Sequence, residues 1–230
     1  MAAEASSHVL SAVIFDLDGV LVDSEIWWDE VRQDYAASHG RTWTVDDRAA
    51  VMGANSRQWS ATMASRLDVP FAPPDIERAV VDEMVRRYRD LPPPLIPGAV
   101  EAVRRLAGTV PLAVASSAHP AVIRSALAAT GLAAVFDVVV SSDEVEHGKP
   151  EPDVYLEAAR RLGVDPAGCV VVEDSLNGVL AARRAGMVAV LVPNGSVPPA
   201  PGARQAANLV LASIEDFRPE VALASAGSAR

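Results

Sequence analysis

The last two-thirds of the chain alternate short apolar runs with helical patterns. The apolar runs typical of strands cover residues 110–115, 135–140, 169–172 and 188–192. The helical patterns cover residues 98–107, 119–130, 151–162 and 176–185. Because apolar strands that alternate with helices of this length form parallel sheets covered on both faces, the pattern predicts an α/β fold. The apolar run at 9–15 should add another strand to the same sheet.

Residues 24–92 have a different pattern. Helices are expected at roughly 25–39, 55–67 and 75–90, and the proline-rich stretch 91–98 has the composition of a stiff linker. We therefore predict a helical domain at 24–95, inserted into a core formed by 1–23 and 96–230. All four tryptophans fall in the insertion, where we expect them to pack in its core, with one or two facing a substrate.

The remaining segments carry weaker signals. The Ala/Ser-rich stretches 1–7 and about 220–230 are expected to fray, and 193–201 is expected to be a loop. No apolar run approaches the roughly 20 residues that a membrane helix needs, and no signal peptide is evident at the first residues. The single cysteine, Cys169, lies in an apolar run, which fits a reduced compartment. These features favour a cytoplasmic protein, for which a monomer is the default expectation.

The chain is acidic, with a formal net charge of −10 and a pI of about 4.8. Such a charge disfavours nucleic acids and anionic membranes as partners, because both are bound largely by lysine and arginine. A small phosphorylated substrate remains possible where a site supplies local positive charge. Nineteen of the twenty basic residues are arginine, and Lys149 is the only lysine.

Two aspartates follow the first apolar run. Asp16 and Asp18 are separated by one residue, so both can point to the same side of an extended segment. Carboxylates that end a buried strand are costly to desolvate and are normally paired or bound to a metal. With Gly19 allowing a sharp turn, the pattern predicts a Mg²⁺-dependent site.

Three further strand ends carry polar residues. They are Ser116 and Ser117, then Lys149 after a loop, then Glu173 and Asp174. Each has an ordinary alternative: Ser116 could form a strand-end turn, Lys149 could be a solvated loop residue, and Asp174 could cap a helix. Ligands of open parallel sheets bind beyond the carboxyl ends of the strands, so the coincidence favours one site.

Four segments together resemble the motifs of the haloacid dehalogenase-like (HAD) hydrolase superfamily. They are DLDGVLVDSE at 16–25, ASS at 115–117, GKPEPD at 148–153 and VEDS at 172–175. Within the superfamily, the chain is most similar to the beta-phosphoglucomutase-like and phosphoglycolate-phosphatase-like subgroup. The resemblance implies a Rossmann-like parallel sheet with helices on both faces and an inserted α-helical cap. It also implies a Mg²⁺-dependent phosphatase that acts on a small phosphorylated metabolite.

The resemblance further implies a role for each acid. Asp16 would attack phosphorus and form an aspartyl-phosphate. Asp18 would protonate the leaving oxygen and then activate water. Mg²⁺ would be held by Asp16, the backbone carbonyl of Asp18 and Asp174, with Glu173 as a direct or water-mediated ligand.

The same resemblance assigns the phosphate-binding groups. The Ser116 hydroxyl, the Ser117 amide and Lys149 would hold the phosphoryl oxygens. Arg57, in a stretch that resembles the family's specificity loop, would grip a distal phosphate or carboxylate, although it could equally be a surface arginine. The substrate would be a sugar phosphate or a phosphoglycolate-like ester.

Alternative functions differ at identifiable positions. Dehalogenases of this superfamily lack the second acid, so Asp18 favours phosphoryl chemistry. The sugar-phosphate mutases carry a cap histidine where this chain has Trp28, which disfavours a beta-phosphoglucomutase-like activity. A non-catalytic binding module is the least favoured alternative, because Asp16, Asp18, Lys149 and Asp174 are all present.

Overall fold

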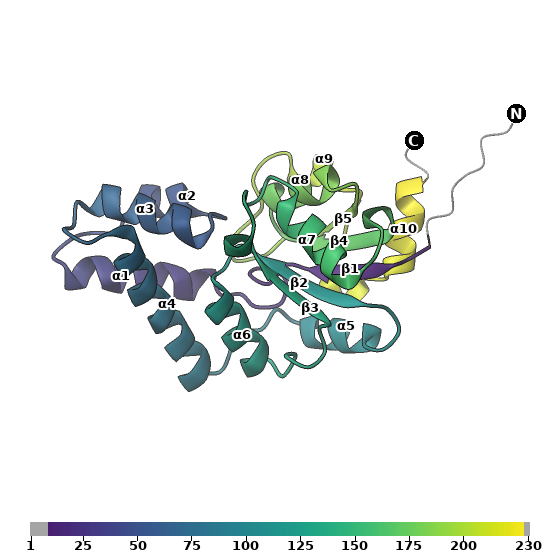
Figure 1. Ribbon diagram of the computed structural model, residues 1–230, viewed down its shortest axis with the longest axis horizontal. Helices are drawn as coiled ribbons and strands as arrows, with labels where there is room; N and C mark the ends of the chain where they lie inside the picture. Colours follow the sequence, from purple (N-terminus) through teal and green to yellow (C-terminus); the bar gives the residue numbers. More distant parts are fainter. Residues whose placement is uncertain (1–8, 228–230) are drawn as a thin grey trace, which may run out of the picture.

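The computed structural model describes residues 9–227, and within them six parallel strands form one sheet in the order β3-β2-β1-β4-β5-β6. The strands are β1 (Ala12–Phe15), β2 (Leu112–Ser116), β3 (Val138–Ser141), β4 (Cys169–Glu173), β5 (Val188–Leu191) and β6 (Leu209–Val210). The predicted α/β fold with a parallel sheet is therefore confirmed (Figure 1).

The central strand is buried on both faces. Every residue of β1 is 0% exposed, and Val13 pairs with Leu112 of β2 and Val170 of β4. Alternate side chains enter two separate cores: Val13 and Phe15 pack in one, and Ala12 and Ile14 pack in the other. This arrangement explains why the strands read as continuous apolar runs rather than as an alternation of polar and apolar residues.

Helices cover both faces of the sheet (Figure 1). The core helices are α5 (Ala99–Leu106), α6 (Pro120–Ala129), α7 (Asp153–Leu162), α8 (Leu176–Arg184), α9 (Ala203–Ala206) and α10 (Pro219–Gly227). Short 3-10 helices occupy Ser142–Glu144, Pro166–Gly168 and Ile214–Asp216. Side chains of α7 and α8 join the core that contains Ile14, whereas those of α5 and α6 join the core that contains Phe15.

Two expectations about the core need correction. The third strand spans Val138–Ser141 rather than 135–140, because Val135 donates its N–H to Leu132 and still lies in the turn that follows α6. The expected fraying from about residue 220 is wrong as far as residue 227, where α10 ends; its Ala222 is fully buried. The expected loop at 193–201 contains no helix or strand, and residues 1–7 lie outside the described range.

Four of the five helices between β1 and β2 gather at one end of the molecule (Figure 1). They are α1 (Glu25–Ser38), α2 (Val45–Val51), α3 (Ser56–Leu67) and α4 (Pro73–Asp90). Helix α2 was not expected, but its start is marked by a capping box in which Thr44 and Asp47 bond each other's backbone N–H. Trp28, Trp43 and Trp59 are buried in the core, as predicted.

The chain crosses between the sheet and these helices at two places that lie side by side. Asp23 donates its N–H to the Pro94 carbonyl at 2.6 Å, and Ile96 donates to Leu21 at 3.2 Å. The insertion also touches the core through Ser56, whose N–H donates to Asp143 Oδ1 at 3.0 Å. The boundaries 23/24 and 95/96 stay predictions. Among residues 9–227, no helix is both long enough and apolar enough to cross a membrane.

Candidate active site

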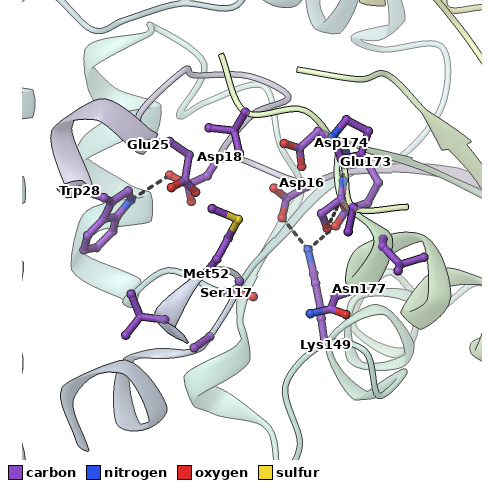
Figure 2. A pocket seen from close by; sticks show the side chains of 18 of the residues that line it. Asp16, Asp18, Glu25, Trp28, Met52, Ser117, Lys149, Glu173, Asp174 and Asn177 are labelled. Atoms are coloured by element: carbon purple, nitrogen blue, oxygen red, sulfur yellow. Dashed lines mark hydrogen bonds and ion pairs between the residues drawn. The ribbon is translucent and has the colours of Figure 1, made fainter. Parts of the chain in front are cut away.

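A cavity of about 310 Å³ lies where the carboxyl ends of the central strands meet the helical insertion. Its charged lining residues are Asp16, Asp18, Glu25, Arg32, Lys149, Glu173 and Asp174. Val197–Ala200, from the loop after β5, also line it, as do Trp28 and Trp59 from the insertion. The strand ends identified in the sequence thus converge on one space, with side chains from both parts of the chain facing it (Figure 2).

Lys149 contacts the ends of three strands, β1, β2 and β4. Its Nζ lies 2.5 Å from Asp16 Oδ1 and 2.7 Å from Glu173 Oε1 (Figure 2). It also donates to the Ala115 carbonyl at 3.1 Å. Burial alone would lower the pKa of Lys149, but attraction to Asp16 and Glu173 outweighs it and holds that pKa well above the usual value. The lysine therefore stays cationic beside the two carboxylates.

Three carboxylates form a cluster that suits a divalent cation. Asp16, Glu173 and Asp174 each offer an oxygen within 4.8 Å of the others. Burial raises the pKa of Asp16 to about 8 and, with Glu173 and Asp16 as neighbours, holds the pKa of Asp174 well above its usual range. The clustered anions are thus costly without a further cation, and an all-oxygen set is what Mg²⁺ prefers.

Gly19 leaves room for Asp174 to lie close to Asp16. It has a φ of +83°, and a Cβ at this position would lie 2.0 Å from Asp174 Oδ2. A side chain here would push Asp174 away from Asp16, so the close approach depends on glycine. The residues present therefore fit a magnesium ion, which Asp16, Asp174 and Glu173 would hold.

Asp18 faces the insertion rather than the cluster. Its Oδ1 accepts a hydrogen bond from Trp28 Nε1 at 3.2 Å (Figure 2). It also accepts one from the Ser24 hydroxyl. Its Oδ2 accepts from the Ser116 hydroxyl at 3.4 Å. The side chain is not part of the three-carboxylate cluster, so only its backbone carbonyl remains as the predicted ligand.

The two serines at the end of β2 occupy different places. Ser116 is fully buried, and its hydroxyl accepts the Ala118 N–H at 3.0 Å as well as facing Asp18. Ser117 lines the cavity. Arg57 does not line it: its guanidinium donates to the Val145 carbonyl at 3.0 Å, between the insertion and the core. Its predicted contact with substrate stays a prediction.

Sequence reasoning missed two charged residues of the cavity, Glu25 and Arg32. With Trp28 they lie three and four residues apart on α1, which places them on one face of the helix. Burial, with Asp18 nearby, raises the pKa of Glu25, and burial lowers the pKa of Arg32 to about 10. The spacing of Glu25, Trp28 and Arg32 in the sequence was the signal that could have identified this face of α1.

The sequence is similar to one family model and to several phosphatases. A model described as haloacid dehalogenase-like hydrolase matches residues 10–186. Hexitol phosphatase B of Escherichia coli is 34% identical over 219 residues, which cover 89% of this chain and 90% of the relative. Fructose-1-phosphate phosphatase YqaB of Escherichia coli is 32% identical over 180 residues, covering 78% and 95%. The bifunctional riboflavin kinase/FMN phosphatase of Arabidopsis thaliana is 33% identical, and the chain spans only 55% of its length.

Solved structures of similar architecture support the same grouping. CbbY from Rhodobacter sphaeroides in complex with phosphate superposes with a TM-score of 0.78 at 26% identity, covering 90% of this chain and 96% of the other. A putative beta-phosphoglucomutase from Thermotoga maritima superposes with a TM-score of 0.67 at 31% identity, covering 96% and 100%.

Proposed function

The chain belongs to the haloacid dehalogenase-like hydrolase family, and we propose that it is a Mg²⁺-dependent phosphatase that cleaves small phosphorylated metabolites through an aspartyl-phosphate on Asp16. Two relatives of matching length are named hexitol phosphatase and fructose-1-phosphate phosphatase. The observation that carries the proposal is the contact of buried Lys149 with Asp16 and Glu173, all three of which line the cavity.

Asp16 is the nucleophile of the proposed reaction. One of its carboxylate oxygens forms a bond to phosphorus while the ester oxygen leaves, so a mixed anhydride replaces the ester. Lys149, with Nζ 2.5 Å from Asp16 Oδ1, puts a positive charge beside the phosphoryl oxygens. A bound Mg²⁺ would screen the repulsion between the carboxylate and the phosphoryl group. Ser117 lines the same space, where its backbone amide is expected to bind a phosphoryl oxygen.

Asp18 moves the protons. It gives a proton to the leaving oxygen and then takes one from the water that hydrolyses the anhydride, which restores both aspartates. Hydrogen bonds from Ser24, Trp28 and Ser116 fix its orientation. Oδ1 accepts two of these hydrogen bonds and Oδ2 only one, so Oδ2 keeps a position free for the substrate.

Trp28 argues against the mutase alternative. An indole N–H is a donor only, so it cannot take a proton from a sugar hydroxyl as a histidine can. Here that N–H is also engaged with Asp18 at 3.2 Å. The phosphoryl group on Asp16 is therefore expected to pass to water rather than to a second sugar hydroxyl.

Phosphate release from a panel of phosphomonoesters tests the proposed function. We expect turnover with Mg²⁺, loss of turnover with EDTA, and recovery when Mg²⁺ is added back. With beta-glucose 1-phosphate and its bisphosphate activator, we expect free phosphate and no glucose 6-phosphate. Turnover that persists in EDTA, or its absence across the whole panel, would contradict the phosphatase proposal, and formation of glucose 6-phosphate would establish the mutase.

Mg²⁺ should stabilise the protein more at about pH 8 than at about pH 6. The folded-state pKa of Asp16, about 8, lies above its ordinary value of 3.8, so the folded state holds a proton that the unfolded chain has lost between these values. Without metal, stability contributed by this proton falls as pH rises through that range. Mg²⁺ binds the ionised carboxylates. The increase in melting temperature that Mg²⁺ causes should therefore be larger at about pH 8 than at about pH 6.

Melting temperatures measured with Mg²⁺ and with EDTA at both pH values check this prediction. Asp174→Asn should reduce the effect of Mg²⁺, whereas Asp46→Asn, at an exposed position in the insertion, should preserve it. An equal rise in melting temperature at both pH values would show that Asp16 does not hold its proton as described.

A further inference from the structure

Arg32 is a buried arginine on the insertion side of the cavity. It is 7% exposed and lines the cavity from α1. Its guanidinium carbon lies 5.0 Å from the ring centre of Trp28 and 5.4 Å from that of Trp59. The two indoles hold the planar cation in place without satisfying its N–H donors.

The Arg32 guanidinium lacks a hydrogen-bonded partner at its Nε. Within residues 9–227 no carboxylate forms an ion pair with it, although Glu25 faces the same cavity. Arg87, which is also largely buried, instead has ion pairs with Glu30, Asp34 and Glu83. A buried cation with an unused donor is costly, and an anion that binds it offsets that cost.

The two buried cations of the cavity thus differ in what they hold. Lys149 lies on the core side and is bound to Asp16 and Glu173. Arg32 lies on the insertion side, where its Nε has no hydrogen-bond partner within residues 9–227 and Glu25 is the acid that attracts it most. A substrate whose phosphate lies against Asp16 would extend its other end toward the insertion, and a guanidinium binds the paired oxygens of a carboxylate or a phosphate especially well.

We propose that Arg32 is a specificity-determining residue that binds an anionic group, a carboxylate or a second phosphate, at the end of the substrate remote from the phosphate that is cleaved. This inference rests on the proposed phosphatase function and adds the class of substrate to it. Neutral sugar and polyol phosphates of equal size would leave the guanidinium unpaired and would be poorer substrates.

Matched pairs of substrates test the proposal with the intact protein. 3-Phosphoglycerate and glycerol 3-phosphate differ at the remote end by a carboxylate against a hydroxymethyl group. Fructose 1,6-bisphosphate and fructose 1-phosphate differ by the second phosphate. We expect kcat/KM to favour the anionic member of at least one pair by about tenfold or more, and the pair that shows the preference identifies which anion Arg32 binds.

Variants of Arg32 connect that preference to the guanidinium. Arg32→Gln should lower kcat/KM for the preferred anionic substrate by about 100-fold, mostly through KM, and should collapse the ratio between the two members of the pair. Arg32→Lys should retain part of the ratio, because it keeps the charge and loses the paired geometry. Arg78→Gln removes an equal charge from an exposed position in α4 and should leave the ratio unchanged.

The outcomes separate this inference from the proposed function. Hydrolysis with no preference for either anionic substrate would overturn the role of Arg32 and leave the phosphatase intact. An Arg32→Gln variant that melts normally but keeps the ratio would overturn it as well. Failure to hydrolyse any phosphomonoester, with wild-type protein and Mg²⁺, would overturn the phosphatase proposal and this inference together.

Discussion

Asp16→Asn should reduce phosphate release by about 10⁴-fold or more, because an amide cannot form the anhydride with phosphorus. The substitution keeps the size of the side chain and removes a buried carboxyl group, whose pKa burial raises to about 8. Lys149 retains Glu173 as a partner at 2.7 Å, so the fold should persist. Steady-state kinetics with Mg²⁺ measure the loss, and thermal melting confirms that the variant is folded.

The same substitution elsewhere in the loop provides the control. Asp23 lies in the segment between β1 and α1 but does not line the cavity; it accepts hydrogen bonds from Asn194 and Ser196. Asp23→Asn should therefore keep activity within a few-fold of wild type. Comparable activity of Asp16→Asn and wild type would rule out Asp16 as the nucleophile.

Lys149→Met should both inactivate the protein and destabilise it. Asp16 and Glu173 are 6% and 1% exposed, and the substitution removes the cation that lies between them. Breaking such a buried pair costs about 3–5 kcal/mol of unfolding free energy, because an uncompensated charge is left behind. Urea unfolding in EDTA measures this loss, and phosphate release should fall by at least about 100-fold.

A neighbouring hydroxyl provides the matched comparison. Tyr155 donates its hydroxyl proton to Glu173 Oε1 at 2.8 Å, so Tyr155→Phe removes one neutral donor from the same carboxylate. Its expected cost is about 1 kcal/mol. If Lys149→Met proved no more destabilising than Tyr155→Phe, the ion pairs of Lys149 would contribute little to stability, and its importance would be confined to phosphate binding.

The sequence predicted the sheet well, because the pattern of apolar residues by itself largely determines where buried strands form. Apolar runs and helical periods predicted the parallel sheet, because a strand buried on both faces can hardly avoid being apolar throughout. The strand ends then placed Asp16, Lys149 and Glu173 near one another, since the carboxyl ends of parallel strands share one edge. Their contacts at 2.5 and 2.7 Å depend on side-chain conformation, which periodicity does not specify.

Which residues of the insertion face the cavity was harder to predict. Arg32 and Glu25 belong to a helix whose polar residues would be solvated if the helix lay on a surface. They face the cavity only because the insertion packs over the end of the sheet, which is a tertiary arrangement. Arg57 lies in the stretch that resembles the family's specificity loop, but its guanidinium contacts the Val145 carbonyl. Charge and spacing alone did not distinguish these arginines.

The position of Lys149 has a consequence for chemical labelling. Nineteen of the chain's twenty basic residues are arginine, so an acylating reagent selective for side-chain amines has a single target, the Nζ of Lys149. That atom is held by two carboxylates in a side chain that is 4% exposed, which disfavours the neutral amine that acylation requires. Lysine acylation would therefore report on a single atom of the cavity.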